Sequence, residues 1–325
     1  MTPPTTRVIA ERSGDEPGPT LIVIGGMHGN EPAGIVAART AIAALDRAAI
    51  RGDIVALVGN LRACAAGRRH LGRDLNRMWT DEQIAAARAA VAGPEPAADG
   101  APERREVRDV RDAREAPEVP EVHELVELAG AIDAAIGRAR GPVYVLDLHT
   151  TSAPGFPFAV VGSTAAHRRF AQAFQLPGII GLEEALPGVL TGHLGRRGCV
   201  TLAIEGGQHT TRDAADNLGA VVTVALEATG VVAAMPGAEA ARAHLAKVRG
   251  ALPLLIEVTL RHPVRPEHAF CMEPGFANLQ RTAAGTLLAR DRGGEIRAPF
   301  DGVVLLPLYQ PDGDDGFFYG RAITE

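Results

Sequence analysis

Two histidines and two glutamates in this sequence have the types and the spacing of a hydrolytic zinc site. His28 and Glu31 lie three residues apart in a glycine-rich segment, and His149 and Glu205 follow much later in the chain. Catalytic zinc commonly takes three protein ligands of the His₂Glu kind and leaves a fourth position for water. His28, Glu31 and His149 would supply that set, and Glu205 would remain as a spare acid.

Each of these residues also has an ordinary explanation. A histidine and a glutamate three apart often form only a hydrogen-bonded pair in a loop, and a histidine at the end of a buried strand is often a satisfied polar residue. Asp147, two residues before His149 in an apolar run, would be costly to bury without a polar or cationic partner. The case for metal chemistry therefore depends on the elements that would bring these side chains together.

Three short apolar runs predict strands of one sheet: Leu21–Ile24, Val143–Leu146 and Cys199–Ile204. The residues that could do chemistry follow the ends of these strands, so one edge of the sheet could gather them. Pro32 and the alanine-rich stretch after it predict a helix over residues 33–45, because proline fits the first turn of a helix. His28 and Glu31 are therefore expected on a turn from strand to helix.

A further motif lies between residues 59 and 79. It reads Gly59-Asn60-Leu61-Arg62-Ala63, then Gly67-Arg68-Arg69-His70, then Arg73-Asp74-Leu75-Asn76-Arg77-Met78-Trp79. Together with Gly-Gly-Met-His-Gly-Asn-Glu, Asp-Leu-His-Thr and Ile-Glu-Gly-Gly, in this order, it resembles the succinylglutamate desuccinylase/aspartoacylase family of the zinc carboxypeptidase clan. The motifs extend from Gly25 to Gly207. The C-terminal segment also resembles the small β domain of that family.

The resemblance implies a role for each matching residue. His28, Glu31 and His149 would hold one zinc ion per chain, and Glu205 would act as general base and acid. Asp74 would accept the free ring N–H of His28, which fixes the tautomer of that ligand and raises its basicity.

The same resemblance assigns the substrate contacts. Asn76 and Arg77 match the pair that holds the substrate carboxylate, which a planar guanidinium can grip through two parallel hydrogen bonds. The arginine five residues before Asp74 is Arg69, which would polarise the scissile carbonyl, with the neighbouring Arg68 as the alternative. Arginine-rich loops are usually solvated surface, so these assignments depend on the motif.

The implied function is a zinc-dependent hydrolase of linear, non-peptide amide bonds that deacylates an N-acyl amino acid or a similar small amide bearing a carboxylate. Two alternatives remain: a zinc carboxypeptidase acting on peptides, and an inactive, zinc-stabilised binding protein. Glu205 argues against the second, because an inactive site has no chemical need for the base. The acyl group, the amine and the C-terminal aromatic residue that reaches the site, among Phe317, Phe318 and Tyr319, stay open.

Short apolar runs alternate with alanine-rich stretches as far as about residue 234, which predicts an α/β fold. With the resemblance, we expect a mixed, mostly parallel sheet covered by helices, as in zinc carboxypeptidases, and a small C-terminal β domain. The expected segments are a catalytic domain at 1–250, a flexible insertion at 93–120, a helix at 122–140 and a β domain at 251–325 that caps the site. The β domain is expected from the runs 254–260, 286–289 and 303–306.

Composition limits the partners. A chain of 325 residues, 46% hydrophobic and 22% charged, is typical of a soluble globular protein with room for two domains. A net charge of −6 argues against a nucleic-acid surface, and no apolar run has the length of a membrane span. The three separated cysteines indicate neither a disulfide framework nor a thiolate metal site. The polar N-terminus favours a cytoplasmic location, and the number of subunits, including a homo-oligomer, is left open.

Overall fold

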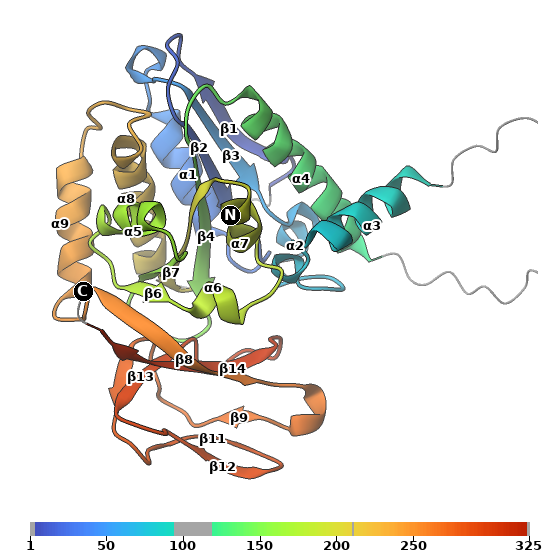
Figure 1. Ribbon diagram of the computed structural model, residues 1–325, viewed down its shortest axis with the longest axis vertical. Helices are drawn as coiled ribbons and strands as arrows, with labels where there is room; N and C mark the ends of the chain where they lie inside the picture. The colour runs from blue at the N-terminus through green and yellow to red at the C-terminus, as the bar shows by residue number, and fades with distance from the viewer. Residues whose placement is uncertain (1–3, 94–118, 210, 324–325) are drawn as a thin grey trace, which may run out of the picture.

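The main feature of the protein is one large mixed sheet, shown by a computed structural model that describes residues 4–93, 119–209 and 211–323 (Figure 1). Within these ranges the sheet has, in spatial order, strands β1 (Val8–Ser13), β3 (Asp53–Val58), β2 (Thr20–Gly25), β4 (Val143–Thr151), β7 (Val200–Gln208), β5 (Phe158–Val161), β6 (Gly178–Ile180), β8 (Leu255–Pro263), β14 (Asp315–Ala322), β13 (Gly302–Leu305) and β10 (Gln280–Thr282). β3, β2, β4 and β7 run parallel to one another, as do β5, β6 and β8.

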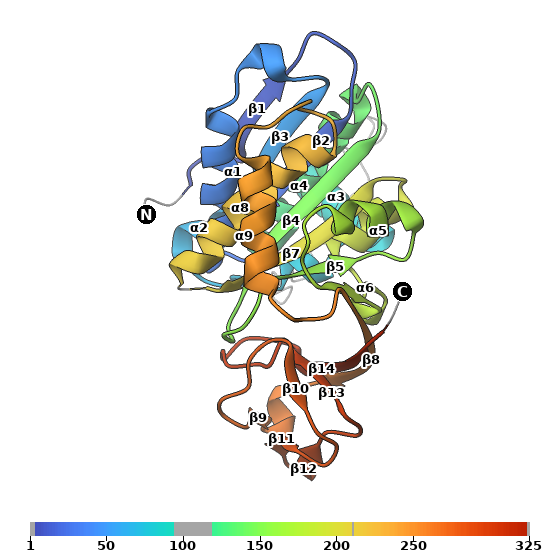
Figure 2. The same ribbon diagram turned by 90° about the vertical axis from the view of Figure 1, so that its left-hand side faces the viewer.

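Helices cover both faces of this sheet. One face carries α1 (Ala33–Ala43), α5 (Ala165–Gln172), α8 (Arg212–Ala228) and α9 (Ala238–Arg249). The other carries α3 (Asp81–Ala92), α4 (Pro120–Arg138) and α7 (Leu190–Arg196). Two short helices, α2 (Leu61–Ala66) and α6 (Leu182–Ala185), and three 3₁₀ turns, η1 (Arg47–Ala49), η2 (Leu75–Arg77) and η3 (Pro266–His268), lie in the connections. Figure 2 shows α1, α8 and α9 together in front of the sheet.

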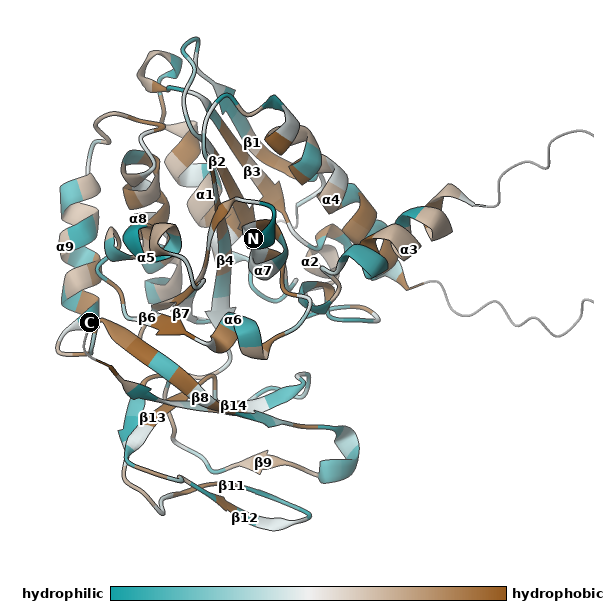
Figure 3. Cartoon of the chain, in the orientation of Figure 1, coloured by the Kyte–Doolittle hydropathy of each residue, from teal (hydrophilic) through white to brown (hydrophobic). Residues whose placement is uncertain are grey.

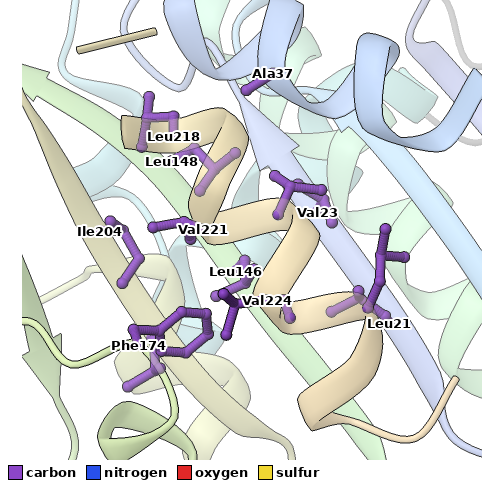
Figure 4. Packing of buried hydrophobic residues seen from close by; sticks show 14 of the residues in the cluster. Leu21, Val23, Ala37, Leu146, Leu148, Phe174, Ile204, Leu218, Val221 and Val224 are labelled. Carbon is purple, nitrogen blue, oxygen red and sulfur yellow. The ribbon is translucent and has the colours of Figure 1, made fainter. Parts of the chain in front are cut away.

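Strand β2 shows why helices must cover both faces of the sheet. Leu21 and Val23 pack in the cluster with α1 and α8, whereas Ile22 and Ile24 pack in the cluster with α4. Successive side chains of a strand point to opposite faces, so a continuous apolar run must be buried on both. Figure 4 shows the first cluster under α8, and Figure 3 shows hydrophobic colour along the inner strands with hydrophilic colour on outer helices such as α9.

The C-terminal segment continues the same sheet. Strand β8 pairs in parallel with β6 of the N-terminal part and antiparallel with β14 of the C-terminal part. A separate sheet of three antiparallel strands, β12 (Gly294–Arg297), β11 (Leu287–Asp291) and β9 (Cys271–Met272), closes the far end of the molecule. The expected fold class is thus confirmed, with a mostly parallel α/β sheet and a small antiparallel C-terminal part.

Three further expectations from the sequence can be compared with the structure. The helix expected at 122–140 begins earlier, at Pro120, because proline at the first helical position has its φ angle already set. Of the flexible insertion expected at 93–120, residues 94–118 lie outside the described ranges, whereas Gly93 caps α3 and Pro120 begins α4. Among the helices that the structure describes, none is both long and apolar enough to cross a membrane.

Candidate active site

The residues expected to do chemistry meet at the carboxyl ends of β2, β4 and β7. Strand pairing places His149 of β4 opposite Glu205 of β7. β2 pairs with β4 on its other side, and the loop that follows β2 carries His28 and Glu31. The parallel register of these strands therefore delivers all four side chains to one edge, as the sequence pattern predicts.

The loop between β2 and α1 depends on glycine. A Cβ atom at Gly29 would lie 2.1 Å from the backbone carbonyl carbon of Ala63 in α2, so only glycine allows this approach. The Gly29 N–H donates to the carbonyl oxygen of Arg69, 3.1 Å away. The histidine loop and the arginine loop are thereby fixed to each other beside the site.

His28, Glu31 and His149 form the metal-type cluster that the sequence predicts. The Glu31 carboxylate lies between the two imidazoles, with Oε1 2.8 Å from His28 Nδ1 and Oε2 3.2 Å from His149 Nδ1. One potential ligand atom from each residue falls within 4.8 Å of the others, and all three residues are buried. No second group of three such side chains occurs in the described ranges.

A second carboxylate faces the other nitrogen of each imidazole. His28 Nε2 lies 3.2 Å from Asp74 Oδ1, and His149 Nε2 lies 2.9 Å from Asp147 Oδ2. Such partners fix the tautomer of a metal-binding histidine and leave its first nitrogen free for the ion. Asp74 is expected in this role from the motif, whereas Asp147 is not, although Asp147 and His149 must share a face of the strand because they are two residues apart.

The charges of this cluster compensate one another. Burial alone would raise the pKa of Glu31, but His28 and His149 hold it well below its usual value. Burial alone would lower the pKa of His149, but Asp147 and Glu31 raise it well above the ordinary range. Without a metal ion, His149 is therefore protonated. A histidine that binds a metal must be neutral, so binding of a cation would release that proton.

Arg69 is fixed beside the cluster and Arg68 is not. One Arg69 nitrogen lies 2.8 Å from Asp74 Oδ2 and the other 3.6 Å from Glu31 Oε1, whereas Arg68 is exposed. The loop that carries Arg69 is held by Glu121 of α4, whose buried carboxylate accepts the backbone N–H groups of residues 71, 72 and 73. Helix α4 thus supports the site through a residue that the sequence argument did not single out.

Glu205 has the surroundings expected of an acid–base group. Its side chain is partly exposed to the pocket, and its Oε2 atom is buried with no hydrogen-bond partner in the described structure. Burial raises the pKa of Glu205 to about 8, against the opposing effect of His149. A carboxyl group with such a pKa can both accept and return a proton near neutral pH.

Asn76 and Arg77 lie on the 3₁₀ turn η2 at the side of the pocket. Asn76 Oδ1 accepts the backbone N–H of Leu190, so its amide is held in one orientation. One Arg77 nitrogen donates to the Asn76 carbonyl oxygen at 3.0 Å, and another lies 3.3 Å from Asp315 Oδ2 at the start of β14. Asp315 also lies 2.6 Å from Arg261 of β8, so the C-terminal part contacts the expected carboxylate clamp.

A pocket with a cavity of about 140 Å³ joins these groups. Its lining includes every metal-cluster residue, Arg69, Asn76, Arg77 and Glu205. The C-terminal part contributes the segment 306–315 and Phe318, which is the aromatic residue of the C-terminal group that lines this pocket. Drug-sized ligand pockets are commonly about 300–1,000 Å³, so this cavity suits a small ligand.

His209 is a further residue of this pocket that the sequence argument left without a role. It follows Glu205 by four positions; its Nδ1 lies 2.8 Å from Thr150 Oγ1 and its Nε2 3.4 Å from Gln310 Oε1. The Thr150 backbone N–H donates to Glu31. By contrast, His193 and Trp79 lie outside the pocket lining, with their tilted rings 6.0 Å apart, and Trp79 is a core residue.

Comparisons with known proteins agree with this geometry. Residues 17–94 match the family model of the succinylglutamate desuccinylase/aspartoacylase catalytic domain, which confirms the resemblance predicted from the motifs. No curated protein matches the chain by sequence.

Solved structures share the fold over almost the whole chain. The ectoine utilization protein EutE (DoeB) from Ruegeria pomeroyi is 19% identical, with a TM-score of 0.61, over 95% of this chain and 87% of its own. A succinylglutamate desuccinylase/aspartoacylase from Rhodobacter sphaeroides is 18% identical, with a TM-score of 0.64, over 95% and 87%. The succinylglutamate desuccinylase from Chromobacterium violaceum is 15% identical, with a TM-score of 0.61, over 95% and 86%. At these identities the likeness concerns the fold.

Proposed function

We propose that this chain, whose residues 17–94 match the catalytic domain of the succinylglutamate desuccinylase/aspartoacylase family, is a zinc-dependent amidohydrolase. Its substrate would be an N-acyl amino acid or a similar small amide with a free carboxylate. One observation carries the proposal: the cluster of His28, Glu31 and His149 shares a small pocket with Glu205 and with Arg77.

The residues of the cluster fit a zinc ion. Two imidazole nitrogens and a carboxylate oxygen converge, and each imidazole has a carboxylate on its other nitrogen, which is the usual arrangement around a zinc-bound histidine. When bound, zinc would supply an activated water and polarise the scissile carbonyl group. His28, Glu31 and His149 would hold the ion.

The remaining residues have separate tasks. Glu205 would take a proton from the attacking water on its carboxylate and pass that proton to the leaving nitrogen, for which a pKa near neutrality is suited. Arg69 would donate hydrogen bonds to the carbonyl oxygen as negative charge develops there, since Asp74 and Glu31 already hold its guanidinium at the cluster.

Asn76 and Arg77 would orient the substrate. The free N–H groups of the Arg77 guanidinium and the Asn76 side-chain amide line the pocket, where they would hold the carboxylate of the amino acid half. This contact would hold the scissile amide beside the metal cluster, so that part of the binding energy serves to align the amide with the reacting groups. Residues of the segment 306–315 form part of the wall of this pocket, whose small cavity of about 140 Å³ favours a small substrate over a peptide.

The decisive test is an assay of the zinc-loaded protein with N-acetyl, N-formyl and N-succinyl amino acids, with short peptides as the comparison. We expect hydrolysis of at least one N-acyl amino acid, loss of activity on chelation and recovery with zinc. Glu205→Gln should retain zinc and lose turnover by about 10²–10⁴-fold, because an amide cannot accept the proton. Turnover at the parent rate in this variant would reject Glu205 as the base, and preferred cleavage of peptides would make the chain a carboxypeptidase.

A further inference from the structure

The catalytic pocket is lined by more acidic than basic side chains. Five carboxylates line it, those of Glu31, Glu183, Glu205, Asp314 and Asp315. The guanidinium groups of Arg69 and Arg77 are the two cations of the lining in the described structure. A divalent metal would be balanced by the carboxylates of its own ligand and of the base, so the rest of the pocket stays acidic.

These two cations are largely engaged within the protein. Arg69 is held by Asp74 and Glu31 in the metal cluster, and Arg77 shares Asp315 with Arg261. The single lysine of the sequence, Lys247, lines a different cavity. The pocket therefore offers one clamp for one substrate carboxylate, at Arg77, and no second arginine or lysine of the described lining is free for another.

Apart from Glu205, two carboxylates of this lining, Glu183 and Asp314, form no ion pair with a cation of the described residues, and of these Glu183 is half-buried whereas Asp314 is exposed. Glu183 lies in the first turn of α6, beside the apolar wall formed by Leu182, Leu186 and Val189. Burial raises its pKa, which a hydrogen bond with Thr191 partly offsets. Figure 1 shows α6 at the lower end of the N-terminal part, above β8 and β14.

We propose that Glu183 makes this pocket selective for N-acyl amino acids with a single carboxylate, by repelling a second carboxylate on the acyl group or on the amino acid side chain. The inference rests on the proposed deacylase function and names its substrate class. Succinyl and aspartyl groups, from which the matched family takes its name, each bring an additional carboxylate that this lining does not neutralise. Like charges within about 8 Å, at an effective dielectric constant near 20, repel strongly enough for roughly tenfold discrimination or more.

Matched substrate pairs test the proposal. N-acetylasparagine is compared with N-acetylaspartate, and N-butanoylalanine with N-succinylalanine, so that each pair differs by one charge. In the zinc-loaded parent, kcat/KM should favour the member with a single carboxylate in at least one pair by about tenfold or more. Glu183→Gln should reduce that ratio at least about threefold. Glu184→Gln, in the exposed neighbour outside the pocket lining, should leave the ratio within about twofold of the parent.

Binding separates this inference from the proposed function. Calorimetric titration of the zinc-loaded Glu205→Gln protein with the same pairs needs no turnover. A preference for the members with a single carboxylate there would support the role of Glu183 even if no amide is hydrolysed. Glu183→Ala serves as a second variant if Glu183→Gln does not fold. Equal affinity and equal kcat/KM within both pairs, or an unchanged ratio in a folded Glu183 variant, would overturn the proposal.

Discussion

Glu205 should destabilise the metal-free protein, and the effect should grow with pH. Its pKa is raised to about 8 in the folded chain, chiefly by burial, whereas an unfolded chain restores the ordinary value near 4.5. The folded state therefore favours the neutral acid. Replacing Glu205 with glutamine removes the charge and keeps the shape of the side chain, so the variant should not show this dependence on pH.

The sign and the size of the effect follow from proton linkage. A raised pKa stabilises the fold fully below the unfolded pKa of about 4.5 and loses that contribution as the pH rises to about 8. At about 1.36 kcal/mol for each unit of pKa, the loss has an upper bound near 5 kcal/mol. Because the Glu205 side chain is partly exposed to solvent, we expect roughly 2 kcal/mol.

Urea unfolding of the chelated proteins between pH 5 and pH 9 measures this effect. Trp79, the only tryptophan of the chain, is buried in the N-terminal part and reports the transition by fluorescence. The unfolding free energy of Glu205→Gln relative to the parent should rise with pH and level off above pH 8, and bound zinc should reduce the difference because a cation lowers the pKa of Glu205. Glu184→Gln is the exposed control. Parallel pH profiles of parent and Glu205→Gln would refute the buried, raised-pKa state of Glu205.

Three further changes test the rest of the site. Asp147→Asn and Asp74→Asn should each weaken zinc binding by about 10–100-fold in a chelator competition, and an unchanged affinity would remove that residue from the support of the histidines. Arg77→Ala should lower kcat/KM by the equivalent of about 2–5 kcal/mol, and Arg77→Lys should lower it by less. Converting the substrate carboxylate to an amide should then lower kcat/KM of the Arg77→Ala variant only a little. Additive losses in kcat/KM would show that Arg77 and the substrate carboxylate are not in contact. Gly29→Ala should lower the melting temperature and the zinc affinity, because the new Cβ atom would clash with the backbone of α2. Gly130→Ala is the control, since a Cβ atom there has no neighbour within 4 Å and should not destabilise the protein. Equal melting temperatures of the two variants would contradict this packing.

The sequence predicted the part of the site that is encoded locally. The apolar runs before His28, His149 and Glu205 fix strand ends, and parallel strands gather their ends at one edge, so the convergence of these residues follows from pattern alone. Asp147 could also have been predicted as the partner of His149, because residues two apart on a strand share a face.

The contacts that connect distant segments could not be predicted in this way. Asp315 meets Arg77 across 238 positions of sequence, through the pairing of β14 with β8, and no local pattern encodes that distance. Glu183 lies in a helix of four residues without a motif, so its place on the pocket wall follows only from the packing of α6. Glu121 follows the expected insertion and belongs to none of the motifs, yet it is buried and accepts hydrogen bonds from the loop of Arg69.

The continuous sheet also affects how a substrate would reach the cluster of His28, Glu31 and His149. Because β8 is hydrogen-bonded to β6 on one side and to β14 on the other, the two parts of the protein cannot rotate apart without breaking backbone ladders. Ligand exchange must then use the loops at the mouth, above all the segment 306–315, and not a swing of one lobe against the other. If the pocket entrance is already formed before the substrate binds, little binding energy is needed for a conformational change. That binding energy is then available to orient the amide.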